Sequence, residues 1–355
     1  MAVPFDLAEY ERAGRTFVIA EIAQAHDGSL GILQSLVDAV ATTGVDAIKF
    51  QVHIADAESS LLEPFRVRFS PVDASRYDYW KRMELPLEEW RRLKERCDAQ
   101  DVEFLATPFS NAAVNLLEEV GVRRYKIGSG DLANPLLLER VARTGKEVIL
   151  STGLGSLDEL DAATALLKAN GNAYAVLQCT SRYPTAAEDV GLDWLARFRE
   201  RYHCPVGLSD HSGTIYSCLG AVALGAVAVE AHVTFDKRMF GPDSMASLTV
   251  DEFSSMVEGI RFLEKARGAG PDKLLNEGKQ EMRRMFGKSL AVSRDLPAGH
   301  VLTFDDLEGK KPADAGISVL ELRQVIGRTL KSQKKRGQFL ATDDILLLPL
   351  PEVSR

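Results

Sequence analysis

The sequence predicts an α/β fold: a (β/α)8 TIM barrel followed by a small β-rich domain. Eight short runs of β-branched and other apolar residues alternate with patterns that are typical of amphipathic helices. The eight units fill roughly 250 residues, which is the usual size of such a barrel. Beyond residue 266 the alternation stops and the composition changes, so we expect a second domain there.

The expected strands leave room for a helix between most of them. One such helix is marked by Ser156 and Glu159, which have the spacing of a capping box. A doubly wound open sheet is the alternative fold, but no G-x-G-x-x-G turn follows the first strand. We expect the strands within residues 16–23, 46–52, 102–109, 123–129, 146–152, 174–180, 205–211 and 227–235.

Three segments are expected along the chain. Residues 1–266 form the barrel domain, residues 267–286 a polar linker, and residues 287–355 a small domain with short strands and turns. The connection after the second strand, residues 53–86, is long, aromatic and charged. A loop of that length inside a compact domain is usually functional.

Composition limits the function. The net charge of −8 argues against nucleic acid and anionic membranes as partners. No apolar run approaches the roughly 20 residues that span a bilayer, and the polar N-terminus lacks the apolar core of a signal peptide. The four cysteines show no C-x-x-C pairing, which favours reduced thiols. We therefore expect a cytoplasmic protein.

Polar side chains stand at the C-terminal ends of the expected strands, where barrels hold their catalytic groups. Two of them are lysines, Lys49 and Lys126, and a lysine inside a barrel is costly unless an anion pairs with it. Together with hydroxyls on neighbouring strands, they predict an anion pocket with phosphate as the natural ligand. The other strand-end groups include Glu21, Thr107, Ser129, Ser151, Ser209 and Glu230.

Two histidines stand beside carboxylates at the ends of the last two expected strands. His211 follows Asp210 in GLSDHSGT, and His232 follows Glu230 in EAHVTFD. Neighbouring strands lie about 4.8 Å apart, so these histidines can converge on one metal ion. Two imidazoles leave open positions for water and a substrate oxygen, which suits a Lewis acid.

Several blocks of sequence stand out in combination: IAEIAQAHDGSL, DAIKFQ, YKIGSGD, STG, CTSRYPT, GLSDHSG, EAHVTFD and GPDSMASLT. In this order and spacing they resemble the signatures of the N-acetylneuraminate (sialic acid) synthase family, which includes legionaminic and pseudaminic acid synthases. The resemblance covers about residues 16–266. Residues 288–318 resemble that family's antifreeze-like (SAF) domain.

The resemblance implies an enzyme that condenses phosphoenolpyruvate with an N-acyl amino sugar aldehyde, such as N-acetylmannosamine. The products are a nine-carbon 2-keto acid and phosphate, which leaves by C–O cleavage. The family uses a divalent metal, Mn²⁺ or Mg²⁺. It forms homodimers in which the small domain of one subunit covers the barrel mouth of the other.

The resemblance also implies roles for individual residues. The metal ligands would be His211 and His232, and the acidic groups near the reacting carbons would be Glu21 and Glu230. The sugar contacts would be Gln51, Tyr183 and Asp243. The phosphoenolpyruvate contacts would be Lys49, Thr107, Lys126, Ser129, Ser151 and Ser209.

The sequence departs from the family pattern in three places, and these leave the acceptor sugar open. AHDG, with Ala25 and Asp27, replaces N-H-N-G, and EAHVTF replaces the usual E-K-H-F. In KKPADAG, Lys311 replaces an arginine that reaches the partner's sugar. Lysine lacks the planar bidentate fork of arginine.

Three other functions compete with this interpretation. The first is condensation of phosphoenolpyruvate with a simple aldose or aldose phosphate, as in the deoxy-octulosonate phosphate synthases; the C-terminal domain argues against it. The second is a Schiff-base aldolase that uses Lys126 or Lys49. The third is a non-catalytic sugar-binding protein, which the intact set of acids, histidines and lysines disfavours.

Overall fold

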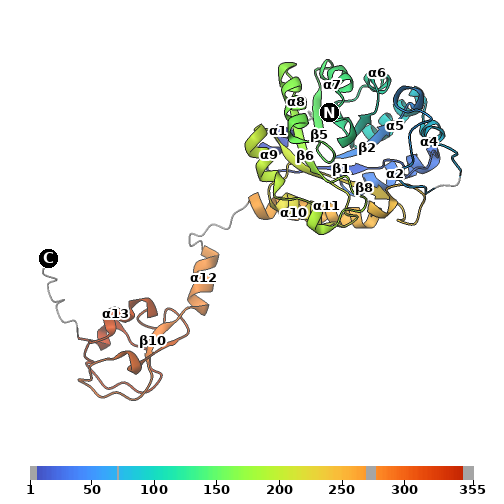
Figure 1. Cartoon of the computed structure of the whole chain (residues 1–355). Coiled ribbons are helices and arrows are strands. Elements are labelled where there is room, and N and C mark those ends of the chain that lie inside the picture. Colours follow the sequence, from blue (N-terminus) through green and yellow to red (C-terminus); the bar gives the residue numbers. More distant parts are fainter. Residues whose placement is uncertain (1–5, 70–71, 269–276, 347–355) are drawn as a thin grey trace. The chain divides into compact units, whose positions relative to one another are not determined.

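The computed structural model describes residues 6–69, 72–268 and 277–346. The chain divides into two compact units, residues 1–269 and 270–355 (Figure 1). Among the described residues, no helix is long and apolar enough to cross a membrane.

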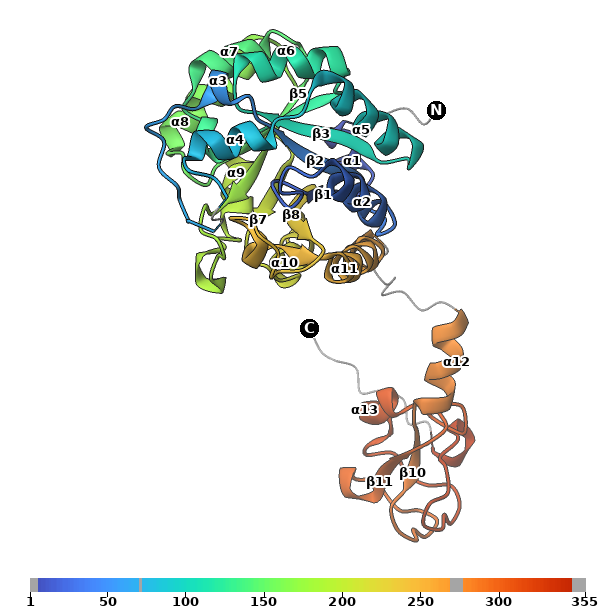
Figure 2. The same cartoon turned by 90° about the vertical axis from the view of Figure 1, so that its right-hand side faces the viewer.

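The first unit is a closed barrel of parallel strands (Figures 1 and 2). Strands that follow one another in the sequence are neighbours in the sheet, and β1 also pairs with β8, which closes the barrel. All eight predicted strands are present, so the prediction of a TIM barrel is confirmed. They are β1 (Phe17–Glu21), β2 (Ala47–Val52), β3 (Glu103–Pro108), β4 (Arg124–Ile127), β5 (Glu147–Ser151), β6 (Tyr174–Cys179), β7 (Val206–Asp210) and β8 (Ala228–Thr234).

Helices follow the strands and cover the outside of the barrel. The predicted capping box is formed: the Ser156 hydroxyl accepts a hydrogen bond from the Glu159 amide, and the Glu159 carboxylate accepts one from the Ser156 amide. A short strand, β9 (Leu248–Thr249), adds to the end of β8. The outer helices are α2 (Leu30–Ala41), α5 (Leu87–Ala99), α6 (Asn111–Val120), α7 (Pro135–Ala142), α8 (Leu157–Ala169), α9 (Trp194–Tyr202), α10 (Tyr216–Ala223) and α11 (Val250–Gly268).

The barrel interior is apolar at its N-terminal end and charged at its C-terminal end. Side chains two positions apart on a strand point the same way, so Glu21 follows Ile19 into the interior and Lys49 follows Ala47. At the N-terminal end, α1 (Leu7–Arg12) inserts Leu7 into an apolar cluster. The cluster contains Phe17, Ile19, Ala47, Leu105, Ile149, Ala175, Leu177, Val227 and Ala228.

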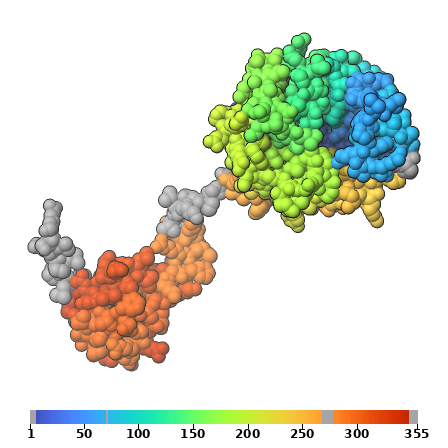
Figure 3. All heavy atoms as spheres, viewed as in Figure 1, coloured from blue at the N-terminus to red at the C-terminus, as the bar shows by residue number. Residues whose placement is uncertain are grey.

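The long connection between β2 and α5 forms local structure of its own. It contains α3 (Ala55–Glu58) and α4 (Arg76–Met83), which lie beside one another in Figure 2. Tyr79, Trp80 and Met83 pack with Ala55 in a small separate core. In the space-filling view this excursion, in blue, borders a hollow in the surface of the barrel unit (Figure 3). The connection is therefore a folded rim at the mouth of the barrel.

The second unit begins with helix α12 (Glu277–Phe286) and contains an antiparallel pair, β10 (Ser289–Val292) and β11 (Leu307–Lys310), and the short helix α13 (Leu322–Val325). The buried carboxylate of Asp306 accepts hydrogen bonds from Arg294 and from Thr303. Its core consists of Leu290, Val292, Leu296, Leu302, Ile317, Val325, Leu330, Leu340 and Ile345. A small β-rich second domain was expected, and this prediction is confirmed.

The structure describes only part of the expected linker, residues 267–286. Helix α11 continues to Gly268, and α12 occupies the last ten residues of the segment. Residues 269–276 lie outside the described residues.

Candidate active site

The register of β1 determines which side chains meet at the C-terminal end of the barrel. Glu21 is in register with Lys49 of β2 on one side and with His232 of β8 on the other. Ser209 of β7 is in register with Glu230 of β8. Because all eight strands run parallel, these residues share one mouth.

Two lysines and two glutamates form a buried charge cluster at this mouth. Lys49 forms an ion pair with Glu21, and its Nζ lies 3.7 Å from Glu230 Oε1. Lys126 Nζ lies 3.6 Å from the same Glu230 oxygen. Each of the four residues is at most 3% exposed. The anion that these buried lysines need is thus supplied, in this structure, by protein carboxylates.

Burial and the neighbouring charges shift the pKa values of this cluster. Burial lowers the pKa of Lys49 to about 8, although Glu230 opposes the shift. Burial alone would raise the pKa of Glu230, but Lys126 and Lys49 lower it to about 2. The second oxygen of Glu230, Oε2, has no hydrogen-bond partner among the described residues. A buried carboxylate oxygen without a partner is costly, so it is a natural contact for a ligand group.

Hydroxyl groups surround the lysines. Lys49 Nζ donates to Thr107 Oγ1 at 3.1 Å, and Lys126 Nζ donates to Ser151 Oγ at 2.6 Å. Ser209 Oγ donates to Glu230 Oε1 at 3.0 Å. Ser129 Oγ accepts from the Gly153 amide at 3.0 Å. The structure therefore brings together the residues that the sequence predicted for an anion pocket, while their contact with phosphoenolpyruvate stays a prediction.

The two predicted metal ligands face each other, with ring centroids 5.2 Å apart. His211 Nδ1 lies 3.0 Å from the Thr180 carbonyl oxygen, so this nitrogen donates and Nε2 is left as a possible ligand. Burial holds the pKa of His232 well below its usual value, which keeps this ring neutral as a ligand must be. Across residues 6–69, 72–268 and 277–346, no group of three or more His, Cys, Asp or Glu side chains is arranged to hold a metal. A metal ion bound by this histidine pair stays a prediction.

The predicted sugar contacts on the barrel lie next to these histidines. The Tyr183 ring lies 4.1 Å from the His211 ring between centroids. Asp243 Oδ2 lies 4.0 Å from His232 Nδ1. Arg66 was not predicted from the sequence; its guanidinium lies 4.3 Å from the Tyr183 ring centroid and forms an ion pair with Asp243. The only signal for Arg66 in the sequence was its position in the long connection after the second strand.

Lys311 belongs to the second unit and not to the barrel. There its Nζ lies 4.9 Å from the ring centroid of Phe286. The prediction that it reaches a partner's sugar site is therefore not tested within one chain.

A second set of residues that sequence analysis missed contacts Gln51. The His53 ring stacks between Trp80 and Phe109, with centroid distances of 3.9 and 4.5 Å. Its Nδ1 lies 2.7 Å from Glu58 Oε1, and its Nε2 lies 3.2 Å from Gln24 Nε2 and 3.3 Å from Gln51 Oε1.

The Gln24 side-chain amide donates to the Gln51 side-chain oxygen. These contacts tie the Gln51 side chain to His53 and, through it, to Glu58. The sequence signal for them was His53 itself, which follows directly after the end of β2.

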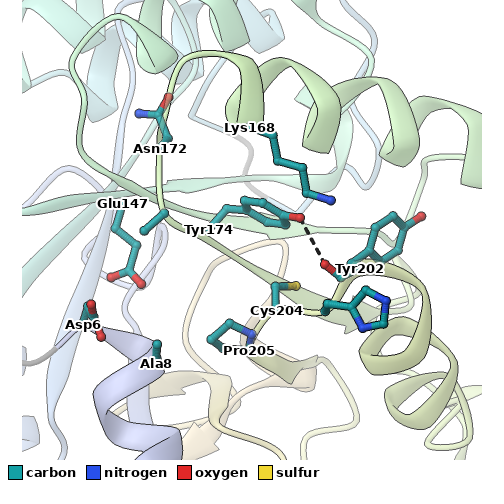
Figure 4. A pocket seen from close by; sticks show the side chains of 11 residues that line it. Asp6, Ala8, Glu147, Lys168, Asn172, Tyr174, Tyr202, Cys204 and Pro205 are labelled. Carbon is teal, nitrogen blue, oxygen red and sulfur yellow. Dashed lines mark hydrogen bonds between the residues drawn. The ribbon is translucent and has the colours of Figure 1, made fainter.

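A large surface pocket of about 350 Å³ lies at the opposite end of the barrel. Figure 4 shows Asp6, Glu147, Lys168, Tyr174 and Tyr202 around it, with Tyr174 donating a hydrogen bond to the Tyr202 carbonyl. None of the predicted site residues lines this pocket. At the mouth, a small pocket of about 10 Å³, roughly the size of a water, lies between Gln24, His232 and Asp243.

Comparison with protein families gives two matches. Residues 36–272 match the model of the NeuB family, and residues 287–346 match the model of the SAF domain. The chain is 32% identical over 332 residues to the N,N'-diacetyllegionaminic acid synthase of Campylobacter jejuni subsp. jejuni, which covers 92% of this chain and 99% of that protein. It is 31% identical to the N-acetylneuraminate-9-phosphate synthase of Homo sapiens, covering 88% of each chain.

A solved structure also resembles this chain. The fold is similar to the N-acetylneuraminic acid (sialic acid) synthetase of Leptospira borgpetersenii serovar Hardjo-bovis, solved in complex with citrate. The TM-score is 0.66 at 31% sequence identity, over 75% of this chain and 90% of that chain.

The lowered pKa of Lys49 predicts a pH-dependent contribution to stability. Folded Lys49 loses its proton near pH 8, whereas the unfolded chain keeps it to about pH 10.4. Unfolding therefore takes up a proton between these values, and the contribution of Lys49 to the free energy of unfolding rises with pH, by about 1–3 kcal/mol. The free energy of unfolding of the wild type, minus that of Lys49→Met, should therefore increase from about pH 7.5 to about pH 10. Urea titrations measure both values.

The exposed Lys265 provides the control, because Lys265→Met should show no comparable change with pH. A wild-type to Lys49→Met difference that stays constant or falls over this range would mean that Lys49 keeps its proton in the folded protein.

Proposed function

The chain belongs to the NeuB family, the sialic acid synthase group, and we propose that it condenses phosphoenolpyruvate with an N-acyl amino sugar aldehyde. The products would be a nine-carbon 2-keto acid and inorganic phosphate. The observation that carries this proposal is the convergence, at one barrel mouth, of a buried lysine pair with hydroxyls and a facing histidine pair. The first set suits a phosphate ester and the second an aldehyde oxygen.

Phosphoenolpyruvate would occupy the lysine side of the mouth. Its phosphate would accept hydrogen bonds from Lys49, Lys126 and the hydroxyls of Thr107 and Ser151, which already surround the two ammonium groups. A dianion bound here would raise the pKa of Lys49, because an added negative charge favours the charged form of the amine.

The acceptor sugar would occupy the histidine side. Tyr183 and the Arg66–Asp243 pair would contact its hydroxyls, and the Gln51 amide would add a further hydrogen bond. A divalent cation, Mn²⁺ or Mg²⁺, bound by His211 and His232 would supply Lewis acid polarisation of the aldehyde oxygen.

The carbon–carbon bond would form when the enol carbon of phosphoenolpyruvate attacks the aldehyde carbon, whose oxygen becomes a hydroxyl after taking a proton. Positive charge then develops on the carbon that bears the phosphate. Glu21 and Glu230 are buried anions at this point of the mouth and would stabilise that charge. Glu21 would also take a proton from the water that adds there.

The tetrahedral carbon then carries a hydroxyl and the phosphate ester. Its C–O bond to phosphate breaks, phosphate leaves with the bridging oxygen, and the hydroxyl becomes the ketone. The lysines would hold the departing phosphate, so the same cations serve binding and release.

The identity of the acceptor rests on the sugar side of the mouth. The named relatives include a diacetyllegionaminic acid synthase and an N-acetylneuraminate-9-phosphate synthase, so a free or a phosphorylated amino sugar is consistent with the family. An aldose or aldose phosphate without the acyl group is the alternative.

The four cysteines are free thiols, which supports a cytoplasmic location, where reduced thiols persist.

An acceptor panel tests this proposal. Purified protein with Mn²⁺ and phosphoenolpyruvate should release phosphate only when a suitable N-acyl hexosamine is added, and mass spectrometry should find the matching nine-carbon 2-keto acid. Lys126→Met should lose at least about 100-fold in kcat/KM, since it removes a charge from the phosphate site. Phosphate release with simple aldoses but with none of the N-acyl sugars would favour the alternative.

Removal of the metal gives a second test. Chelator treatment should abolish turnover and added Mn²⁺ should restore it. His232→Ala should remove one ligand and weaken the affinity for Mn²⁺ roughly ten- to 100-fold. Electron paramagnetic resonance measures the bound Mn²⁺. His203, an exposed histidine on the opposite end of the barrel, provides the control variant. Full turnover in strong chelator would contradict a role for the histidine pair as a metal site.

We further propose that the protein is a homodimer in which the second unit of one subunit covers the barrel mouth of the other. Large apolar side chains are exposed on loops at the mouth, among them Leu61 at 76%, Leu62 at 91% and Met245 at 67%. Helix α12 exposes Met282, Met285 and Phe286 at 55–57%. Large apolar side chains exposed on both units support burial in an assembly. Such a lid would also keep stray water from the developing cation.

Subunit mixing tests the dimer. An inactive Lys49→Ala subunit mixed with an impaired Lys311→Ala subunit should regain activity, because one barrel would then have an intact site and an intact lid from its partner. A protein that is monomeric by light scattering at assay concentration, or verified heterodimers without regained activity, would contradict the arrangement.

A further inference from the structure

A second charged pocket lies at the N-terminal end of the barrel, away from the mouth. It has a volume of about 370 Å³ and is lined by Arg15, Arg199 and Arg267 together with the turn before β8, residues 224–227. The turn precedes β8, and His232 lies toward the other end of that strand. At about 3.3 Å per residue, the pocket is therefore about 20 Å from the predicted metal ligands. The mechanism proposed above uses none of these residues.

Gly225 forms the floor between two of the arginines. A Cβ on Gly225 would lie 3.1 Å from the Arg267 Nη2 atom and 3.3 Å from the Arg199 Nη2 atom. Its backbone has φ +91°, a conformation that side chains rarely adopt. A side chain at this position would therefore crowd both guanidinium groups, and glycine lets the two of them approach the turn closely.

Neutral carbonyl groups hold these guanidinium groups in place. Arg199 Nη2 donates to the Gly225 carbonyl at 2.8 Å, and Arg267 Nη1 donates to the Val222 carbonyl at 2.6 Å. Within residues 6–69, 72–268 and 277–346, neither forms an ion pair with a carboxylate within 4.0 Å. Each guanidinium has five N–H donors, so one bond to a carbonyl fixes its position without neutralising its charge.

The pocket is positive although the chain carries a net charge of −8. Arg15 adds a third guanidinium, which Asp46 partly offsets at 3.2 Å. Glu11 is the one carboxylate among the lining residues. Two guanidinium groups held side by side repel each other, and an anion between them relieves that repulsion.

We propose that this pocket is a binding site for a phosphomonoester, a small organic molecule with a terminal phosphate dianion. The phosphate would sit over Gly225 and accept hydrogen bonds from Arg199 and Arg267, whose forked donors match phosphate geometry. The pocket is larger than a phosphate group needs, and the side chain of Leu224, 53% exposed, offers an apolar surface to the organic part.

The neighbouring pocket of Figure 4 lacks this character. Its charged residues include Asp6 and Glu147, and these carboxylates already accept hydrogen bonds from the backbone amides of Glu9 and Leu7. Binding over Gly225 would join three separate segments, namely α9, the turn after α10, and the last turn of α11. We expect it to rigidify these segments together.

Hydrogen exchange with mass spectrometry on the full-length protein tests this site independently of turnover. Millimolar glucose 6-phosphate should slow amide exchange in peptides that cover residues 194–203, 221–227 and 261–268. Arg199→Gln and Arg267→Gln should each weaken this protection roughly tenfold in apparent affinity, since each removes a charged donor. Arg197→Gln is the matched control: it lies on the same helix, but its guanidinium lies 4.7 Å from the Trp194 ring centroid and outside the pocket.

Three further samples separate the sources of an effect. Inorganic phosphate should protect the same peptides more weakly than glucose 6-phosphate. Glucose alone, and sodium chloride alone at equal ionic strength, should not protect them. Equal protection by inorganic phosphate would overturn the assignment of an organic ligand. Protection by chloride alone, protection unchanged in both arginine variants, or no protection at millimolar ligand would overturn the site itself.

Discussion

The buried ion pairs between Lys49, Lys126, Glu21 and Glu230 are the constraint on which the barrel mouth depends. Two positive and two negative side chains leave water together, which is tolerable only because each faces an opposite charge or a hydroxyl. Such a cluster adds little stability compared with apolar side chains of the same size. Its presence inside a barrel is therefore better explained by function than by folding.

The strand register makes this cluster possible. A shift of β1 by one residue would turn Glu21 out of the barrel and leave Lys49 without its closest partner. The apolar cluster around Leu7 at the other end of the barrel opposes such a shift, because it needs Phe17 and Ile19 inside. Packing at the N-terminal end thus aligns the charges at the C-terminal end.

Much of this organisation can be predicted from the sequence, because it depends on local periodicity. The eight strands are visible as apolar runs, and alternation along β2 places Lys49 and Gln51 on the same face of that strand. The pairing of each lysine with a particular glutamate cannot be predicted, because it depends on side-chain distances across strands that are far apart in the chain. Arg66 and the chain from Glu58 through His53 to Gln51 escape prediction for a related reason: the excursion that carries most of them has no simple period.

Burial lowers the pKa of Lys49, and we propose that this lysine regains its proton when a phosphate-bearing substrate binds. Calorimetric titration with phosphoenolpyruvate near pH 8.5, in buffers of different ionisation enthalpy, measures this directly. We predict uptake of about half a proton per site in the wild type and none in Lys49→Met, because a dianion raises the pKa of a neighbouring amine. Binding without proton uptake, or uptake that persists in Lys49→Met, would contradict protonation of Lys49 by the bound substrate.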